Sequence, residues 1–98
     1  MATWKPKVRE DLAVTILQDE AVVYDTETSD VHHLNLAATI VFRLCDGTLS
    51  VREMAAEIAD AYGVSAKEVE RQVRALLREF TDVRLLDGRV ALSGGKRA

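Results

Sequence analysis

The chain has 98 residues, of which 48% are hydrophobic and 30% are charged, as in an ordinary globular domain. Sixteen acidic and 13 basic side chains give a formal net charge of −3, which argues against a general nucleic-acid binder, because such domains are normally basic. Cys45 is the only cysteine, which excludes an intramolecular disulfide, and neither a signal peptide nor an apolar run of about 20 residues is visible, so we expect one cytoplasmic domain over residues 1–98.

The N-terminal half has the short alternating patterns that are typical of β-strands. Residues 1–7 are expected to form a flexible arm, since Pro6 discourages regular pairing. Strands are predicted over residues 12–17, 21–25 and 31–34, with short polar turns between them. Three strands joined in this way predict a small antiparallel meander.

Three helices are predicted after the strands. Asn35 is a suitable N-cap for the first helix, and Gly47 suits its end. Ser50 and Ser65 each stand three residues before a glutamate, which is the spacing of a capping box and marks the start of the second and third helices. Gly63 follows the second helix as a stop signal.

The C-terminal end predicts a β-hairpin. Asp87 and Gly88 form a two-residue turn signal between residues 83–86 and 89–92, and residues 93–98 are expected to be a flexible tail. Three helices followed by a hairpin have the outline of a winged helix-turn-helix. The predicted fold class is therefore α+β and winged-helix-like, with a three-stranded antiparallel N-terminal sheet followed by three helices and a C-terminal β-hairpin.

The third helix carries a row of basic side chains at spacings of four, three and four residues, which places them on one face: Lys67, Arg71, Arg74 and Arg78. This basic stripe could meet an acidic peptide or, in a winged helix, DNA phosphates. It could equally be a solvated face that pairs locally with neighbouring glutamates. The charge balance of the chain fits an acidic peptide better than DNA.

The third predicted strand, Val31 to Leu34, could be an open edge of the sheet. Its free backbone N–H and C=O groups would then act as a template for an added strand. The alternative is an edge that is merely short and blunted by two histidines. Pairing of this strand with a second copy of the chain would make a dimerisation domain.

Catalytic and metal chemistry find little support in the sequence. His32 and His33 are adjacent in a strand and should point to opposite faces, and no metal-ligand spacing such as CxxC or HxxxH occurs. Cys45 is expected to be a small buried residue. No nucleophile elbow, HExxH or phosphate-loop motif is present, so we expect no catalytic residues, no cofactor and no metal.

The central part of the chain contains a set of short runs: Val23-Tyr24-Asp25, Leu34-Asn35-Leu36-Ala37-Ala38, Leu44, Asp46-Gly47, Ser50-Val51 and the helix that contains Ile58. With these runs, the chain resembles the PqqD family over roughly residues 12–86. The resemblance implies a small peptide chaperone, also called a precursor-peptide recognition element, with three strands followed by three helices. Such a chaperone takes part in natural-product biosynthesis, has no catalytic residues, and presents the leader of a ribosomally made precursor to a modifying enzyme, often a radical S-adenosylmethionine protein.

The resemblance also implies where the leader peptide would bind. It would add as a strand beside the third strand, in a groove walled by the third helix. Carried over by position, the binding edge is Val31, His32, His33 and Leu34, and the helical wall is Lys67, Arg71, Arg74, Ala75 and Arg78. A DNA-binding winged helix and a self-pairing dimerisation domain remain the alternatives.

Overall fold

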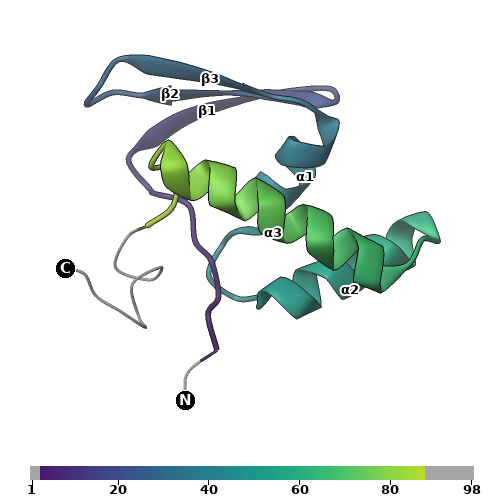
Figure 1. The fold of residues 1–98 in the computed structure, drawn as a ribbon. Coiled ribbons are helices and arrows are strands. Elements are labelled where there is room, and N and C mark those ends of the chain that lie inside the picture. Colours follow the sequence, from purple (N-terminus) through teal and green to yellow (C-terminus); the bar gives the residue numbers. More distant parts are fainter. Residues whose placement is uncertain (1–2, 88–98) are drawn as a thin grey trace.

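The computed structural model describes residues 3–87 of the chain. Its first half is an antiparallel sheet of three strands in the order β1 (Leu12–Leu17), β2 (Glu20–Asp25) and β3 (Asp30–Leu34) (Figure 1). The three predicted strands are confirmed to within one residue at each end. Since β2 lies in the centre, β1 and β3 are the two edges of the sheet.

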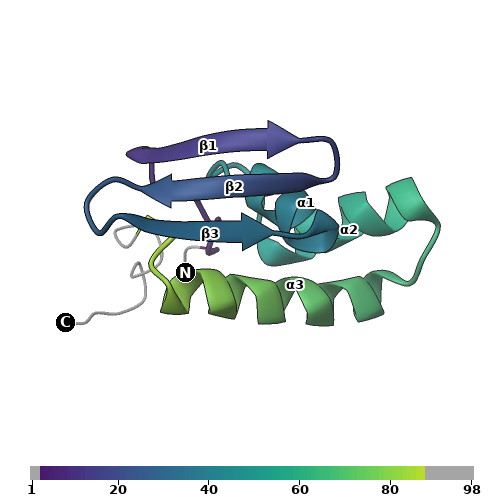
Figure 2. The same ribbon diagram turned by 90° about the horizontal axis from the view of Figure 1, so that it is seen from above.

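Three helices follow: α1 (Leu36–Leu44), α2 (Val51–Tyr62) and α3 (Ala66–Asp82). All three lie on the same face of the sheet, and α3 runs along the side of β3 (Figures 1 and 2). None of the helices within residues 3–87 is long and apolar enough to span a membrane. The α+β order of a three-stranded antiparallel sheet followed by three helices is therefore confirmed.

The predicted helix starts are confirmed by their caps. Asn35 Oδ1 accepts the Ala38 N–H at 2.9 Å, and Ser50 makes a complete capping box with Glu53. Ser65 Oγ accepts the Glu68 N–H at 3.4 Å. Residues early in each helix have no helical partner for their N–H groups, so these three side chains fix where the helices begin.

The predicted end of α1 is wrong by two to three residues. The helix ends at Leu44, and Cys45 is its C-cap. Gly47 instead occupies the following turn at φ +87°, where its N–H donates to the carbonyl of Pro6 at 3.0 Å. A left-handed glycine was therefore needed here for contact with the N-terminal arm, and not for a helix cap.

The N-terminal arm is packed over its described part, contrary to the prediction of a flexible segment over residues 1–7. Pro6 is buried, and Trp4 packs against the core. The N–H of Val8 donates to the carbonyl of Cys45 at 2.9 Å, which ties the arm to the end of α1.

The prediction of a β-strand over residues 83–86, as the first half of a C-terminal hairpin, is also wrong. After α3 the chain turns at Arg84, with φ +62°, and Leu86 makes a single antiparallel bridge with Val8. Leu85 is 1% exposed, so the core holds this segment beside the arm. Residues 89–92, the other half of the predicted hairpin, lie outside the described residues, and the winged-helix assignment is not confirmed.

The hydrophobic core lies between the sheet and the helices. Met54 of α2, Leu77 of α3 and Val23 of β2 are almost completely buried. Phe42 of α1 meets Phe80 of α3 edge to face, with ring centroids 5.9 Å apart. This packing fixes the distance between α3 and the sheet, and it leaves the strip between α3 and β3 only partly filled.

Candidate functional site

A groove of about 470 Å³ lies between β3 and the C-terminal half of α3. The strand β3 and the helix α3 run side by side along one flank of the molecule (Figure 2). Seven of the eleven lining residues are apolar, and the other four are two histidines, one amide and one carboxylate. The lining residues are Val31, His32, His33, Leu34, Asn35, Ala38, Leu76, Glu79, Phe80, Val83 and Leu85.

The open edge of β3 exposes backbone hydrogen-bonding groups. The two-residue turn between β1 and β2 closes on the pair Leu17–Glu20, so this pair shares backbone hydrogen bonds. Hydrogen-bonded pairs alternate along an antiparallel ladder, so β2 residues 21, 23 and 25 turn their backbone groups toward β3. On β3, the same alternation directs the N–H and C=O groups of Val31 and His33 to the open edge.

The side chains of β3 divide between the two faces of the sheet. His32 and Leu34 pair with Val23 and Ala21, which lie on the buried face, so they point toward the helices. Val31 and His33 point to the other face, and Val31 is 54% exposed. The two histidine side chains therefore cannot bind the same metal ion. Within residues 3–87, no group of three or more His, Cys, Asp or Glu side chains is placed to hold a metal ion.

His32 carries a buried nitrogen without a partner. Its Nε2 has no hydrogen bond to any described residue, although the side chain lines the groove. A buried polar atom that has lost its water and gained no partner lowers stability by about 1–3 kcal/mol. Sequence reasoning chose His32 for its place on an edge strand, and the structure adds that its Nε2 has no hydrogen-bond partner among the described residues.

We expect His32→Leu to raise the free energy of unfolding by about 1 kcal/mol, because the unsatisfied nitrogen is replaced by an apolar group. His33→Leu is the matched control: His33 lies on the opposite face and should change stability by less than about 0.5 kcal/mol. Urea denaturation of the three proteins measures both values. A loss of stability in His32→Leu would mean that Nε2 makes a hydrogen bond in solution.

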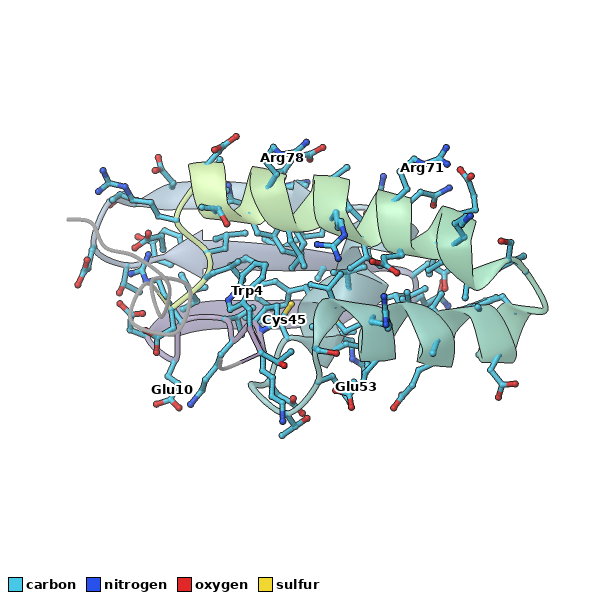
Figure 3. All side chains as sticks on the ribbon, turned by 60° about the horizontal axis from the view of Figure 1, so that its bottom comes forward. Trp4, Glu10, Cys45, Glu53, Arg71 and Arg78 are labelled. Carbon is cyan, nitrogen blue, oxygen red and sulfur yellow. The ribbon has the colours of Figure 1, made fainter. Side chains whose placement is uncertain are left out.

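The basic stripe of α3 lies outside the groove. Leu76 and Arg78 are two residues apart and so lie on nearly opposite sides of the helix. Leu76 lines the groove, while Arg71 and Arg78 point away from the body of the protein (Figure 3). None of the five predicted wall residues lines the groove: Lys67, Arg71, Arg74, Ala75 and Arg78.

Local ion pairs occupy part of this stripe. Arg71 lies 3.4 Å from the Glu68 carboxylate, and Arg74 Nη2 lies 2.7 Å from Glu70 Oε2. Both pairs are largely exposed, so each contributes little to stability. The pairing with neighbouring glutamates that the sequence left open is present for these two arginines.

The actual helical wall of the groove consists of Leu76, Glu79 and Phe80, followed by Val83 just after α3. None of these four residues was among the wall residues expected from the sequence. A signal was present, because Leu76, Phe80 and Val83 recur at helical spacing along one side of the buried stripe. The edge of the buried stripe thus serves as the groove wall.

Cys45 behaves as a structural residue. Its side chain is 1% exposed beneath the N-terminal arm, and burial raises the pKa of the thiol to about 12 (Figure 3). A thiol that stays protonated at neutral pH is a poor nucleophile and a poor metal ligand. The prediction of a small buried residue is confirmed.

The protein is a small α+β domain in which an open edge strand faces an amphipathic helix across a groove. The family model for coenzyme PQQ synthesis protein D (PqqD) matches residues 20–86 of the chain. The chain therefore belongs to the PqqD family, which confirms the resemblance seen in its sequence.

Solved structures share this fold. "TbiB1 in Complex with the TbiA(beta) Leader Peptide" is 24% identical, with a TM-score of 0.74, and the match covers 84% of this chain and 95% of that one. "Lasso peptide synthetase B1 complexed with the leader peptide" is 25% identical, with a TM-score of 0.71 and coverage of 85% and 98%.

A third similar structure is the PqqD truncation of Methylobacterium extorquens PqqCD, described as a functional and stand-alone recognition element for ribosomally synthesised, post-translationally modified peptides. It is 19% identical, with a TM-score of 0.70, and the match covers 84% of this chain and 87% of that one. A comparison with curated protein sequences finds no match. The three likenesses agree on three antiparallel strands followed by three helices.

Proposed function

We propose that this protein is a non-catalytic recognition domain that binds the leader segment of a ribosomally synthesised precursor peptide and presents it to a modifying enzyme, such as a radical S-adenosylmethionine maturase. The observation that carries the proposal is the open edge of β3 beside a groove whose other wall is α3. Two of the similar structures are described as complexes with leader peptides and the third as a recognition element, which supports the same function for this chain.

The leader would bind as a fourth strand next to β3, about 4.8 Å away. The backbone groups of Val31 and His33 would form the ladder with it and supply affinity that does not depend on the peptide sequence. Alternate side chains of the leader would enter the groove, against Leu34 on one side and Leu76 and Phe80 on the other. These contacts would supply the selectivity.

The basic stripe would act from the outer side of α3, since its side chains do not line the groove. We propose that an acidic segment of the leader is attracted by the four basic residues of the stripe, Lys67, Arg71, Arg74 and Arg78. Of the five expected wall residues, Ala75 lies nearest to the groove rim, because it is one turn before Glu79. Charges at such a distance raise the association rate more than they stabilise the complex.

For a leader with net negative charge, we expect Arg71→Glu combined with Arg78→Glu to lower the association rate constant about 3–10-fold and to leave the dissociation rate constant unchanged. The effect should fade as salt is raised toward about 1 M, where screening is nearly complete. Stopped-flow kinetics at two salt concentrations measures both constants.

Arg43→Glu combined with Arg52→Glu is the matched control for this prediction, because it changes the same charge on α1 and α2. It should leave the association rate nearly unchanged. A faster dissociation in the α3 variant would contradict pure steering and would indicate direct contact with the arginines.

The function is tested by titrating isotope-labelled protein with synthetic leader peptides from short reading frames beside its gene. We expect the largest NMR shifts in residues 31–34 and 76–83, with light scattering showing one protein per complex. Shifts confined to other regions would rule out the groove. A protein dimer that persists with peptide present would favour self-pairing through β3.

A further inference from the structure

A second hollow lies at the other end of α3, separate from the β3 groove. It has a volume of about 220 Å³ and forms where the start of α1, the end of α2 and the first half of α3 meet. No charged residue is among those that line it, and Gln72 is its one amide. Its walls include Leu36, Ile40, Ile58, Tyr62, Val69 and Leu76.

Large apolar side chains gather at the mouth of this hollow. Leu36 is 48% exposed, Tyr62 is 58% exposed and Val64 is 53% exposed, although each comes from a different segment of the chain. Single exposed apolar residues are common, but a cluster around a concavity marks a place where another apolar group binds. The volume of the hollow is smaller than that of pockets that bind drug-sized ligands, so the hollow is suited to a single large side chain.

The hollow adjoins the β3 groove. Leu76 lines both, so the two share a wall. The chain also passes from the last residue of β3, Leu34, to the mouth residue Leu36 in two steps. An extended peptide beside β3 that continues past Leu34 for two residues would advance about 6–7 Å in the same direction.

We propose that this hollow is an anchor pocket for one bulky aliphatic or aromatic side chain of the leader peptide, on the N-terminal side of the strand that pairs with β3. The proposal rests on the function proposed above. A strand added antiparallel to β3 runs from the Leu34 end toward the Asp30 end, so the residues that reach the hollow come before the paired segment. The uncharged lining makes an acidic or basic side chain unsuitable, because a buried charge there would have no partner.

The pocket can be tested first without any leader. N-acetyl-tyrosinamide and N-acetyl-leucinamide are titrated into labelled protein, with N-acetyl-aspartamide as the polar control. We expect saturable NMR shifts around Ile40, Val69 and Leu76 with the first two probes and none with the third. Shifts that are scattered over the surface, or equal for all three probes, would overturn the pocket.

A matched pair of variants then tests the pocket directly. Ala37→Phe adds a ring at an exposed lining position of α1, and Ala56→Phe adds the same ring at an exposed position of α2 that does not line the hollow. We expect Ala37→Phe to weaken the binding of N-acetyl-tyrosinamide at least 10-fold and Ala56→Phe to leave it unchanged. Equal behaviour of the two variants would contradict the assignment.

The same variants connect the pocket to the leader. For a leader that shifts the NMR signals of residues 31–34, Ala37→Phe should weaken leader binding about 10-fold. Replacing the leader's apolar residue by alanine should weaken binding by a similar factor. The two changes together should weaken binding no more than either one alone. Unchanged affinity in Ala37→Phe, with shifts at β3 retained, overturns the anchor and leaves the proposed function standing. Leaders that never shift β3 overturn the proposed function itself, whatever the amide probes do.

Discussion

Replacing His33 with proline should weaken leader binding about 10–100-fold while the protein remains folded. The N–H of His33 faces the open edge of β3, where it would donate to the added strand. Proline has no N–H, and its ring would press against the approaching peptide. Because the pairing of β3 with β2 does not use this N–H, an edge strand tolerates the change.

Two variants separate this effect from others. Ile16→Pro places the same residue one position before the end of β1, on the opposite edge of the sheet, where the backbone alternation also turns the N–H outward. It should bind the leader normally. His33→Ala removes the imidazole but keeps the N–H, and it should lose far less affinity than His33→Pro.

Isothermal titration calorimetry with the leader, together with circular dichroism to check folding, measures the outcome. Equal loss in the two proline variants would indicate a general disturbance of the sheet. Wild-type affinity in His33→Pro would mean that the leader does not add to β3.

The strands and the helix starts were predictable from the sequence because short-range rules determine them. The alternation of residues 12–17 and the caps Asn35, Ser50 and Ser65 each lie within a few residues of the structure that they produce. Ser65 shows the limit of this reasoning: its predicted capping box is half formed, because the Glu68 carboxylate lies beside Arg71.

The wall of the groove was not predictable in the same way. Helical spacing correctly placed Lys67, Arg71, Arg74 and Arg78 on one face, but spacing does not tell which side of a helix meets a given strand. That orientation follows from the packing of α3 against α2 and α1, which buries Val73 and Leu77 and involves contacts distant in sequence. The groove therefore uses the edge of the apolar stripe, and the basic face points to solvent.

The C-terminal prediction failed for a related reason. Asp87-Gly88 is a strong local turn signal, but the backbone just before it is already engaged by the N-terminal arm. The Arg9 N–H donates to the Leu85 carbonyl at 2.9 Å, and the Asp87 N–H donates to the Lys7 carbonyl at 2.6 Å. Contacts between the two ends of the chain carry no signature in either segment by itself.

One ion pair joins these distant segments. Asp25 is 3% exposed at the end of β2, and its Oδ2 accepts a hydrogen bond from Arg9 Nη1 at 2.8 Å. Its Oδ1 accepts the Glu27 N–H at 2.9 Å, while Arg9 Nη1 also donates to the carbonyl of Arg84 at 2.9 Å. The arm, the sheet and the segment after α3 thus meet at the guanidinium of Arg9.

Asp25→Asn should lower the melting temperature at pH 7 by about 10 °C. An asparagine has one acceptor oxygen, so its NH₂ group must face either the Arg9 guanidinium or the Glu27 N–H, both of which are donors. Asp11→Asn is the matched control, because Asp11 also pairs with Arg9, at 2.7 Å, but is an exposed residue. A surface pair contributes little, so this variant should melt within about 3 °C of wild type.

The pH dependence of the melting temperature shows whether Asp25→Asn destabilises the protein by removing a charge or by disturbing the packing. The hydrogen bond from Arg9 is the main cause that holds the pKa of Asp25 below its ordinary value of 3.8. A carboxyl whose pKa is lower in the folded state stabilises the protein fully above its unfolded pKa, and this contribution disappears as the pH falls through the folded pKa. The difference in melting temperature between wild type and Asp25→Asn should therefore be constant from pH 7 to about pH 5 and shrink steadily below about pH 4. Thermal melts across this range measure it, and a difference that stays the same down to pH 2 would mean that Asp25 acts through its shape and not through its charge.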